Sequence, residues 1–119
     1  MGSLIYGAPA IEVSFDDRTL AHLELLIGAK LRRRESFMLS WRDSTEVGDG
    51  RSSAWIDNGI PMFFRYSGSR TPLIDKEWLE ELVVQAGSNR GLQLGDDPAT
   101  EQLVRAKDNS VKRKDHPAR

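Results

Sequence analysis

The sequence predicts an α+β domain: an antiparallel sheet with two helices packed on one face, in the order β-β-α-β-β-β-α-β. Three observations lead to this prediction. Two stretches carry apolar residues at the spacing of a helix, and the segments around them carry apolar residues at alternate positions, as strands do. With 119 residues, 39% of them hydrophobic, the chain has the size of one domain with one core.

Two short runs of strand-forming residues begin the chain. "LIYG" and "AIEVSF" are separated by Ala8 and Pro9, a spacing typical of a hairpin. In the second run Ile11, Val13 and Phe15 alternate with polar residues. One face of this strand is therefore predicted to be buried and the other exposed.

The stretch "DDRTLAHLELLIGAKLRRR" predicts the first helix. Leu20, Leu23 and Ile27 fall on one stripe, Asp16 is a good N-cap, and basic residues crowd the end, where the helix dipole favours cations. Gly28 lies inside this helix and lowers its propensity by about 1 kcal/mol relative to alanine. We interpret Gly28 as a sign of close packing against the sheet.

Three strands and a second helix follow. "SFMLSWR", "RSSAWID" and "PMFFRYS" have strand character, and the turn "DNGI" between the last two suits a tight hairpin, which predicts a three-stranded meander. The second helix is predicted to begin near Asp75 and to end at Gly87, and "LQL" is a last short strand. No apolar periodicity remains after Asp96, which predicts one domain over residues 1–95 and a flexible charged tail over residues 96–119.

The composition excludes several classes of function. The chain has no cysteine, which excludes disulfides, thiolate zinc sites and cysteine nucleophiles. Its apolar runs are too short to cross a membrane and its start lacks the features of a signal peptide, which predicts a cytoplasmic protein without membrane contact. The two histidines are too far apart for a local metal motif, and a glycine-flanked nucleophile elbow is missing. We therefore expect no metal and no cofactor.

Several motifs carry a resemblance to a known family. The segments "FDDRTLAHL", "KLRRRESF", "GDGRSSAWI" and "FFRYSGSR" occur in this order. With them the chain resembles, over about residues 1–95, a small domain family common in actinobacteria whose members are often named ATP-dependent DNA ligase. That activity needs a lysine in a Lys-x-Asp-Gly motif, and none of the five lysines has this context. The resemblance thus implies association with a ligase, and the sequence favours a non-catalytic role.

An anion site is predicted at one edge of the meander. In three antiparallel strands the end of the first, the start of the second and the end of the third meet at one edge. Glycines in the loops there would let backbone amides approach an anion. The predicted anion or nucleic-acid site consists of Arg42, Arg51, Ser52, Ser53, Arg65, Ser67, Ser69 and Arg70. The alternative is that these are ordinary turn residues and solubilising arginines.

Aromatic residues on neighbouring strands predict a second feature of the site. Alternation along a strand cannot send all of these rings to the core, so some should lie beside arginines as a platform for stacked bases. The stacking or interface residues are Trp41, Trp55 and Tyr66. The sequence thus predicts a binding module for nucleic acid or another phosphate-bearing ligand, accessory to DNA ligation or repair. The alternative is a protein interaction domain whose exposed aromatic face meets a partner or forms a homodimer.

Overall fold

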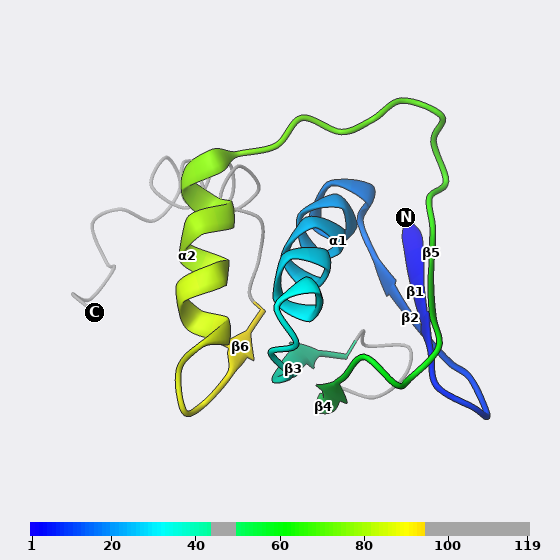
Figure 1. The fold of residues 1–119 in the computed structure, drawn as a ribbon. Coiled ribbons are helices and arrows are strands. Elements are labelled where there is room, and N and C mark those ends of the chain that lie inside the picture. The colour runs from blue at the N-terminus through cyan, green and yellow to red at the C-terminus, as the bar shows by residue number, and fades with distance from the viewer. Residues whose placement is uncertain (44–49, 95–119) are drawn as a thin grey trace, which may run out of the picture.

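Two three-stranded sheets and two helices make up the fold of the computed structural model, which describes residues 1–43 and 50–94 (Figure 1). The elements are β1 (Gly2–Tyr6), β2 (Ile11–Phe15), α1 (Asp17–Arg32), β3 (Phe37–Arg42), β4 (Arg51–Ile56), β5 (Met62–Arg65), α2 (Lys76–Ala86) and β6 (Leu92–Gln93). This confirms the predicted α+β class and element order. The tail predicted over residues 96–119 lies outside the described residues.

The strands form two sheets instead of the single antiparallel sheet that was predicted. One sheet has the order β2-β1-β5 and is antiparallel throughout. The other has the order β4-β3-β6, in which β3 pairs antiparallel with β4 and parallel with β6. The predicted meander is wrong, because β5 pairs with β1 and not with β4.

The turn between β4 and β5 explains why these two strands do not pair. A tight type I′ hairpin needs positive φ at both central residues, and neither Asn58 nor Gly59 has positive φ. The carboxylate of Asp57 instead accepts hydrogen bonds from the Gly59 N–H and from the Ser36 hydroxyl. The turn closes through a bond from the Ile60 N–H to the Asp57 carbonyl. Because a turn of this kind splays its flanking strands, the chain crosses from one sheet to the other.

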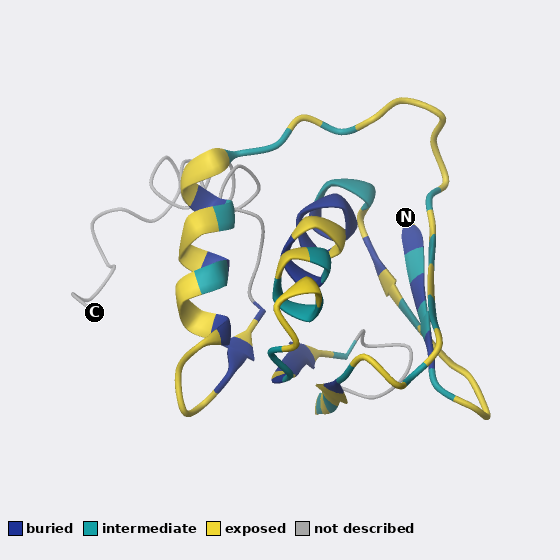
Figure 2. Cartoon of the chain, viewed as in Figure 1, coloured by how far each residue is buried: buried dark blue, intermediate teal, exposed yellow. Residues whose placement is uncertain are grey.

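The two helices pack on each other and on the sheets. α1 contacts β1 and α2, and α2 contacts β3 and β6, so α1 lies between the β2-β1-β5 sheet and α2 (Figure 1). Figure 2 shows that the exposed residues of α2 lie on the side turned away from α1. Asp16 caps α1, as predicted, and Asp75 caps α2, which begins where predicted; each accepts a backbone N–H of the first turn. Within the described ranges, neither helix is long and apolar enough to cross a membrane.

Gly28 does not mark close packing, which corrects the interpretation of this residue. A Cβ added at Gly28 would meet only the end of the flexible Arg32 side chain, at 3.4 Å. Gly91 is the glycine that close packing requires. Its φ is 76°, and an added Cβ would lie 2.5 Å from the backbone oxygen of Met38 on the neighbouring strand.

The core fills the space between the helices and the inner faces of both sheets. Leu20, Leu23 and Leu26 of α1 are fully buried, together with Leu39 of β3 and Ile56 of β4. The two sheets meet where the ring of Phe15 packs edge-on against Trp41, with 6.3 Å between the ring centres. A single core is therefore shared by both sheets.

A buried histidine joins the two helices. His22 of α1 is fully buried, and its ring lies beside that of Trp78 in α2, 4.5 Å away between centres. Its Nδ1–H donates to the carbonyl of Arg18 at 2.7 Å, and its Nε2 accepts the backbone N–H of Asp75 at 2.9 Å. These partners require the neutral ring with its proton on Nδ1, so His22 has the structural role expected of a buried polar residue.

Candidate functional site

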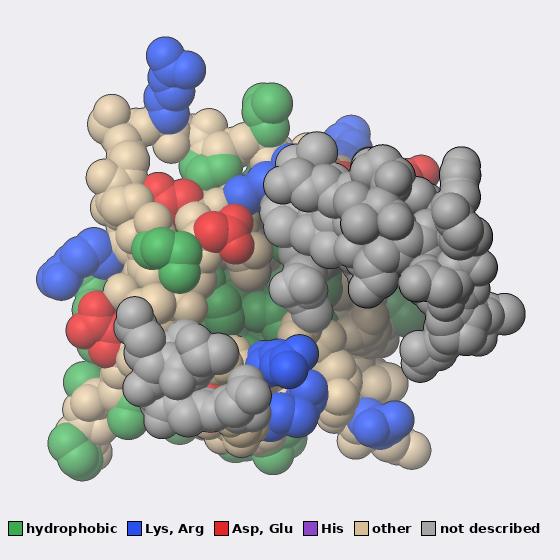
Figure 3. Space-filling model, turned by 180° about the vertical axis from the view of Figure 1, so that it is seen from behind, with side chains coloured by type: hydrophobic (Ala, Val, Ile, Leu, Met, Phe, Trp, Pro, Cys, Tyr) green, Lys and Arg blue, Asp and Glu red, His purple; other side chains and the backbone are tan. Residues whose placement is uncertain are grey.

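Charged side chains are mixed over much of the surface, in keeping with a net charge of −1. In the view of Figure 3, acidic and basic side chains are interspersed with hydrophobic ones. A group of basic side chains lies in the lower half of this view. Since Figure 3 is turned about the vertical axis only, this is the level at which β3 and β4 lie in Figure 1. Local clusters of positive charge, more than the overall balance, are therefore where an anion would be attracted.

The residues of the predicted anion site are divided between the two sheets. Arg42, Arg51, Ser52 and Ser53 belong to β3 and β4, Arg65 ends β5, and Ser67, Ser69 and Arg70 follow β5. Since β5 pairs with β1, the common edge predicted to bring Arg51 and Arg70 together is not formed. That part of the prediction is corrected by the strand pairing.

The loop after β5 does hold an anion, but the anion is a carboxylate of the protein itself. The backbone N–H groups of Ser67 and Gly68 donate to the carboxylate of Asp17 at 3.3 and 2.9 Å, and the Ser67 hydroxyl donates at 3.1 Å. These bonds, the one from Gly68 first among them, hold the pKa of Asp17 below its usual value. The loop therefore ties β5 to the first turn of α1.

Tyr66 and Arg70 line a separate cavity beside α1. The cavity has a volume of about 470 Å³, and Ser69 also lines it. The hydroxyl of Tyr66 donates to Glu24 at 2.6 Å. Burial, followed by this bond to Glu24, raises the pKa of Tyr66 well above its ordinary value. Tyr66 is thus engaged within the protein.

Arg65 is an exposed residue of the β2-β1-β5 sheet. Its guanidinium carbon is 5.4 Å from the centre of the Phe63 ring, which is 54% exposed. This is the distance of a cation–π contact. This arginine and its ring belong to a different sheet from the basic residues of β3 and β4.

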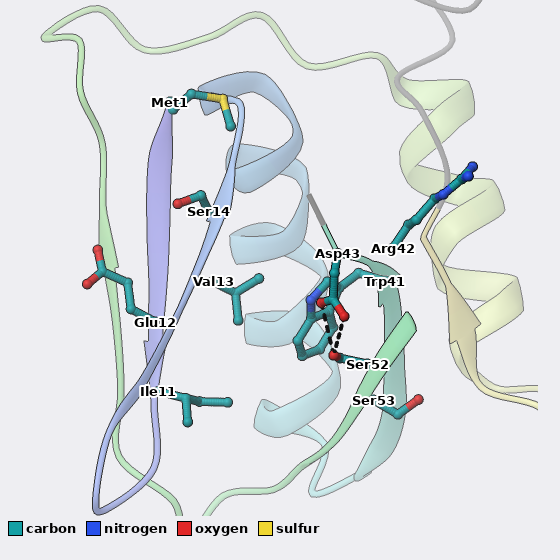
Figure 4. A pocket seen from close by; sticks show the side chains of 10 residues that line it. All are labelled: Met1, Ile11, Glu12, Val13, Ser14, Trp41, Arg42, Asp43, Ser52 and Ser53. Carbon is teal, nitrogen blue, oxygen red and sulfur yellow. Dashed lines mark hydrogen bonds between the residues drawn. The ribbon is translucent and has the colours of Figure 1, made fainter. Parts of the chain in front are cut away.

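A groove of about 700 Å³ separates β2 from the β3–β4 pair (Figure 4). Ile11 and Val13 of β2 line it together with Trp41 of β3. Trp41 is only 7% exposed and packs against Phe15, so it is a core residue more than a surface ring.

Ser52 and Ser53 are directed to opposite sides of β4. The Ser52 hydroxyl lies 2.9 Å from both carboxylate oxygens of Asp43, at the groove. Figure 4 shows Arg42 and Ser53 pointing away from β2, toward the other side of their sheet. Alternation along the strands therefore separates Ser52 from the other predicted residues of β3 and β4.

The predicted residues that do come together lie on the outer face of the β4-β3-β6 sheet. We use the name outer face for Met38, Ser40, Arg42, Arg51, Ser53, Trp55 and Gln93. The register of β3 and β4 forms three cross-strand pairs on it: Arg42 with Arg51, Ser40 with Ser53, and Met38 with Trp55. Asp43 and Gly50, the pair beyond Arg42 and Arg51, are hydrogen-bonded, because the N–H of Asp43 donates to the Gly50 carbonyl. By alternation the three outer-face pairs are of the closer, non-hydrogen-bonded kind, about 4.5 Å between Cα atoms.

The pair of arginines concentrates positive charge at one end of the outer face. Like charges directly opposite each other on two strands are unfavourable. Neither Arg42 nor Arg51 forms an ion pair with any carboxylate in the described part of the chain. Arg51 instead donates from Nη2 to Oε1 of Gln93 in β6, at 3.2 Å. An anion bound between the two guanidinium groups would relieve their repulsion.

Trp55 places an exposed ring at the other end of the outer face. Its side chain is 52% exposed, and that of Met38 beside it is 37% exposed. The Tyr6 hydroxyl donates to the backbone carbonyl of Trp55, which anchors β4 to the other sheet. Sequence reasoning found Trp55 and both arginines but missed Met38 and Gln93. Gln93 reaches this face through the short strand β6. The sequence predicted this strand but carries no clear signal that it pairs parallel with β3.

Comparison with known proteins identifies a family. Residues 1–97 match the family described as "Domain of unknown function (DUF7882)", and the chain belongs to this family. The match covers every element of the fold. No curated protein matches the chain, and no solved structure matches it.

Proposed function

We propose that the chain is a non-catalytic binding module whose outer face engages nucleic acid or another phosphate-bearing ligand. One observation carries the proposal. Arg42 and Arg51 lie directly opposite each other, without a carboxylate partner among the described residues, on the face that exposes the ring of Trp55. Guanidinium groups match phosphate oxygens in a fork geometry and form charge-assisted hydrogen bonds with them.

Each part of the outer face has a role in this proposal. The two guanidinium groups supply the counter-charge for phosphate. Gln93 holds the side chain of Arg51 in place before the ligand arrives, which lowers the entropy lost on binding. Trp55 offers an exposed ring on which a base stacks.

The proposal predicts a small but definite dependence of affinity on salt. The chain as a whole is close to neutral, so binding relies on the arginine pair and not on a broad basic surface. Two phosphates neutralised on a single strand correspond to a slope of about −1.4 in log K against log salt. Binding that is independent of salt would speak against phosphate recognition.

Alanine variants of the two arginines test the proposal. In Arg42→Ala/Arg51→Ala, affinity for a fluorescently labelled oligonucleotide at low salt is expected to fall about tenfold or more, because charge-assisted contacts contribute roughly 1.5–3 kcal/mol each. Arg65→Ala is the matched control, since Arg65 is also an exposed arginine beside an exposed ring. Equal affinities in the double variant and in the wild type would contradict the proposal.

A protein interaction domain is the second candidate function. It is favoured by the exposure of Met38 and Trp55 on the outer face and by the position of β4 at the edge of its sheet. Edge strands and exposed apolar faces are common sites of protein association. Under this alternative, Trp55→Ala abolishes capture of a partner or self-association in sedimentation experiments, and removal of both arginines has little effect.

The resemblance to domains named as ligases supports a more specific version of the proposal, which also names the cellular role. In that version the module acts in the cytoplasm as an accessory to DNA ligation or repair. Its test is a pull-down from the native host, analysed for both proteins and nucleic acid. Recovery of a DNA ligase together with DNA is the expected result, and recovery of neither would remove this more specific version.

A further inference from the structure

We infer that the outer face selects single-stranded nucleic acid, because it is built to hold the phosphate and the base of one unpaired nucleotide. This inference rests on the proposed function and names its substrate class. It follows from the three rows into which the outer face is divided. The basic row contains Arg42 and Arg51, the hydroxyl row contains Ser40, Ser53 and Gln93, and the ring row contains Met38 and Trp55.

The backbone alone would place the basic row too far from the ring row. Arg51 and Trp55 are four residues apart on β4, which is about 13 Å at roughly 3.3 Å per residue. A phosphate directly above the Cα of Arg51 would therefore be remote from a base stacked on Trp55.

Gln93 shortens this separation by directing the side chain of Arg51. Gln93 is the register partner of Ser40, so it belongs to the hydroxyl row. Arg51 donates to Gln93 at 3.2 Å across the intervening strand β3. Its guanidinium group is thereby drawn along the strands toward the hydroxyl row, which is two residues, or about 7 Å, from the ring row, and sideways over β3, which lies about 4.8 Å from β4. The phosphate and the base of one nucleotide are joined by a single sugar and can span neighbouring rows.

The hydroxyl row and the charge of the face fit the same ligand. Ser40 is buried and its hydroxyl lies 2.7 Å from that of Ser53, while Ser53 itself is exposed between the phosphate position and the ring of Trp55. No carboxylate belongs to any of the three rows, so this surface complements a polyanion.

The exposed ring decides between single and double strands. Inside a duplex the faces of the bases are covered by stacking and their Watson–Crick edges by pairing, so a ring on a sheet surface cannot stack on an internal base. An unpaired base offers its face to an aromatic side chain, as in other single-strand binding surfaces. Phosphate contacts alone would accept both forms. Selection of single strands therefore depends on Trp55.

The test compares probes by fluorescence anisotropy with the full-length chain at low salt. The probes are a labelled oligothymidylate, the same backbone with abasic sites in place of bases, and a blunt duplex of equal length. Inorganic polyphosphate serves as a competitor that carries charge without bases. The variants are Trp55→Ala, Gln93→Ala and Arg42→Ala/Arg51→Ala. Phe63→Ala is the control, because Phe63 is an exposed ring beside an arginine on the other sheet.

Four results are expected if the inference is correct. Trp55→Ala weakens binding of the oligothymidylate about tenfold and leaves binding of the abasic probe unchanged, because stacking is lost only where a base is present. Gln93→Ala weakens binding of the oligothymidylate by a smaller factor, and Phe63→Ala has no effect on any probe. The duplex binds the wild type no better than the abasic probe does.

Two other results separate the inference from the function on which it rests. If the arginine variant weakens all probes while Trp55→Ala weakens none, phosphate binding stands and selection of single strands is overturned. If no probe distinguishes the arginine variant from the wild type, the proposed function fails together with the inference. Circular dichroism of each variant confirms that the comparison is made between folded proteins.

Discussion

The carboxylate of Asp17 and the backbone N–H of Gly68 lie 2.9 Å apart, in a hydrogen bond that joins the first turn of α1 to the loop after β5. Ser67 adds its own N–H and its hydroxyl to the same carboxylate. The loop "SGSR" thus has the amide geometry of an anion site, and its anion is internal. This contact leaves the outer face of the other sheet as the surface on which a foreign anion is expected to bind.

Removing the charge of Asp17 is expected to destabilise the fold. Asp17→Asn retains the size of the side chain but weakens three hydrogen bonds that depend on an ionised acceptor. The melting temperature should fall, as measured by circular dichroism. Glu77→Gln is the control, because Glu77 is also an acid in the first turn of a helix. Equal losses in both variants would show that the helix dipole, and not the loop, accounts for the effect.

Stability is expected to decrease at acid pH through two carboxylates. The bond from Gly68 chiefly lowers the pKa of Asp17, and the bond from the Ser36 hydroxyl chiefly lowers the pKa of Asp57. A carboxyl with a lowered folded-state pKa stabilises the protein above its unfolded-state pKa, about 3.9, and this contribution is lost as the pH falls through the folded-state pKa.

Urea unfolding at a series of pH values measures this effect. Between about pH 5 and pH 2, the free energy of unfolding of Asp17→Asn/Asp57→Asn should depend less on pH than that of the wild type. A double variant with the same pH dependence as the wild type would show that other groups cause the acid sensitivity.

Local patterns in the sequence were sufficient to predict the elements of the fold. The stripe of leucines in α1, the caps Asp16 and Asp75 and the alternation in β2 act over a few residues, and each is confirmed as an element boundary or an element. Pairing between distant strands was not predictable in the same way. β5 does not form a hairpin with β4, because the turn at Asn58 and Gly59 lacks positive φ, and the dipeptide "NG" is compatible with either type of turn.

The candidate site was predicted in part for the same reason. Arg42, Arg51, Ser53 and Trp55 share a face because β3 and β4 pair as neighbours with side chains in register, a local relationship that the sequence suggests. Arg70 and Tyr66 were assigned to the same site only through the meander. Gln93 was missed because its place depends on a parallel pair between β3 and β6, whose partners are far apart in sequence.

Substitution of two glycines is expected to have opposite effects. Gly91→Ala should destabilise the fold by about 2 kcal/mol or more, because φ is positive and the added Cβ meets the Met38 carbonyl, which is backbone and cannot move away. Gly28→Ala should stabilise it by about 0.5–1 kcal/mol, because alanine favours the helix and meets only a flexible side chain. Chemical denaturation measures both, and a destabilising Gly28→Ala would restore close packing as the reason for this glycine.

Loss of the hydrogen bonds of His22 is expected to weaken the contact between the helices. His22→Leu keeps an apolar side chain beside Trp78 but leaves the backbone N–H of Asp75 without its acceptor. A cost of about 1–3 kcal/mol in the free energy of unfolding follows from leaving this partly buried donor unsatisfied. Leu25→Ala, at an exposed position of the same helix, should change stability by less than about 1 kcal/mol. Similar costs for the two variants would contradict this role.

The most direct test of the central claim is an NMR titration of the ¹⁵N-labelled chain with a short oligothymidylate at low salt. The account predicts that the largest chemical-shift changes occur at the indole N–H of Trp55, the side-chain amide of Gln93 and the backbone of β3 and β4. Residues around Phe63 and Arg65 on the other sheet should change little. Shifts that are absent from the outer face, or that are centred on the β2-β1-β5 sheet, would contradict it.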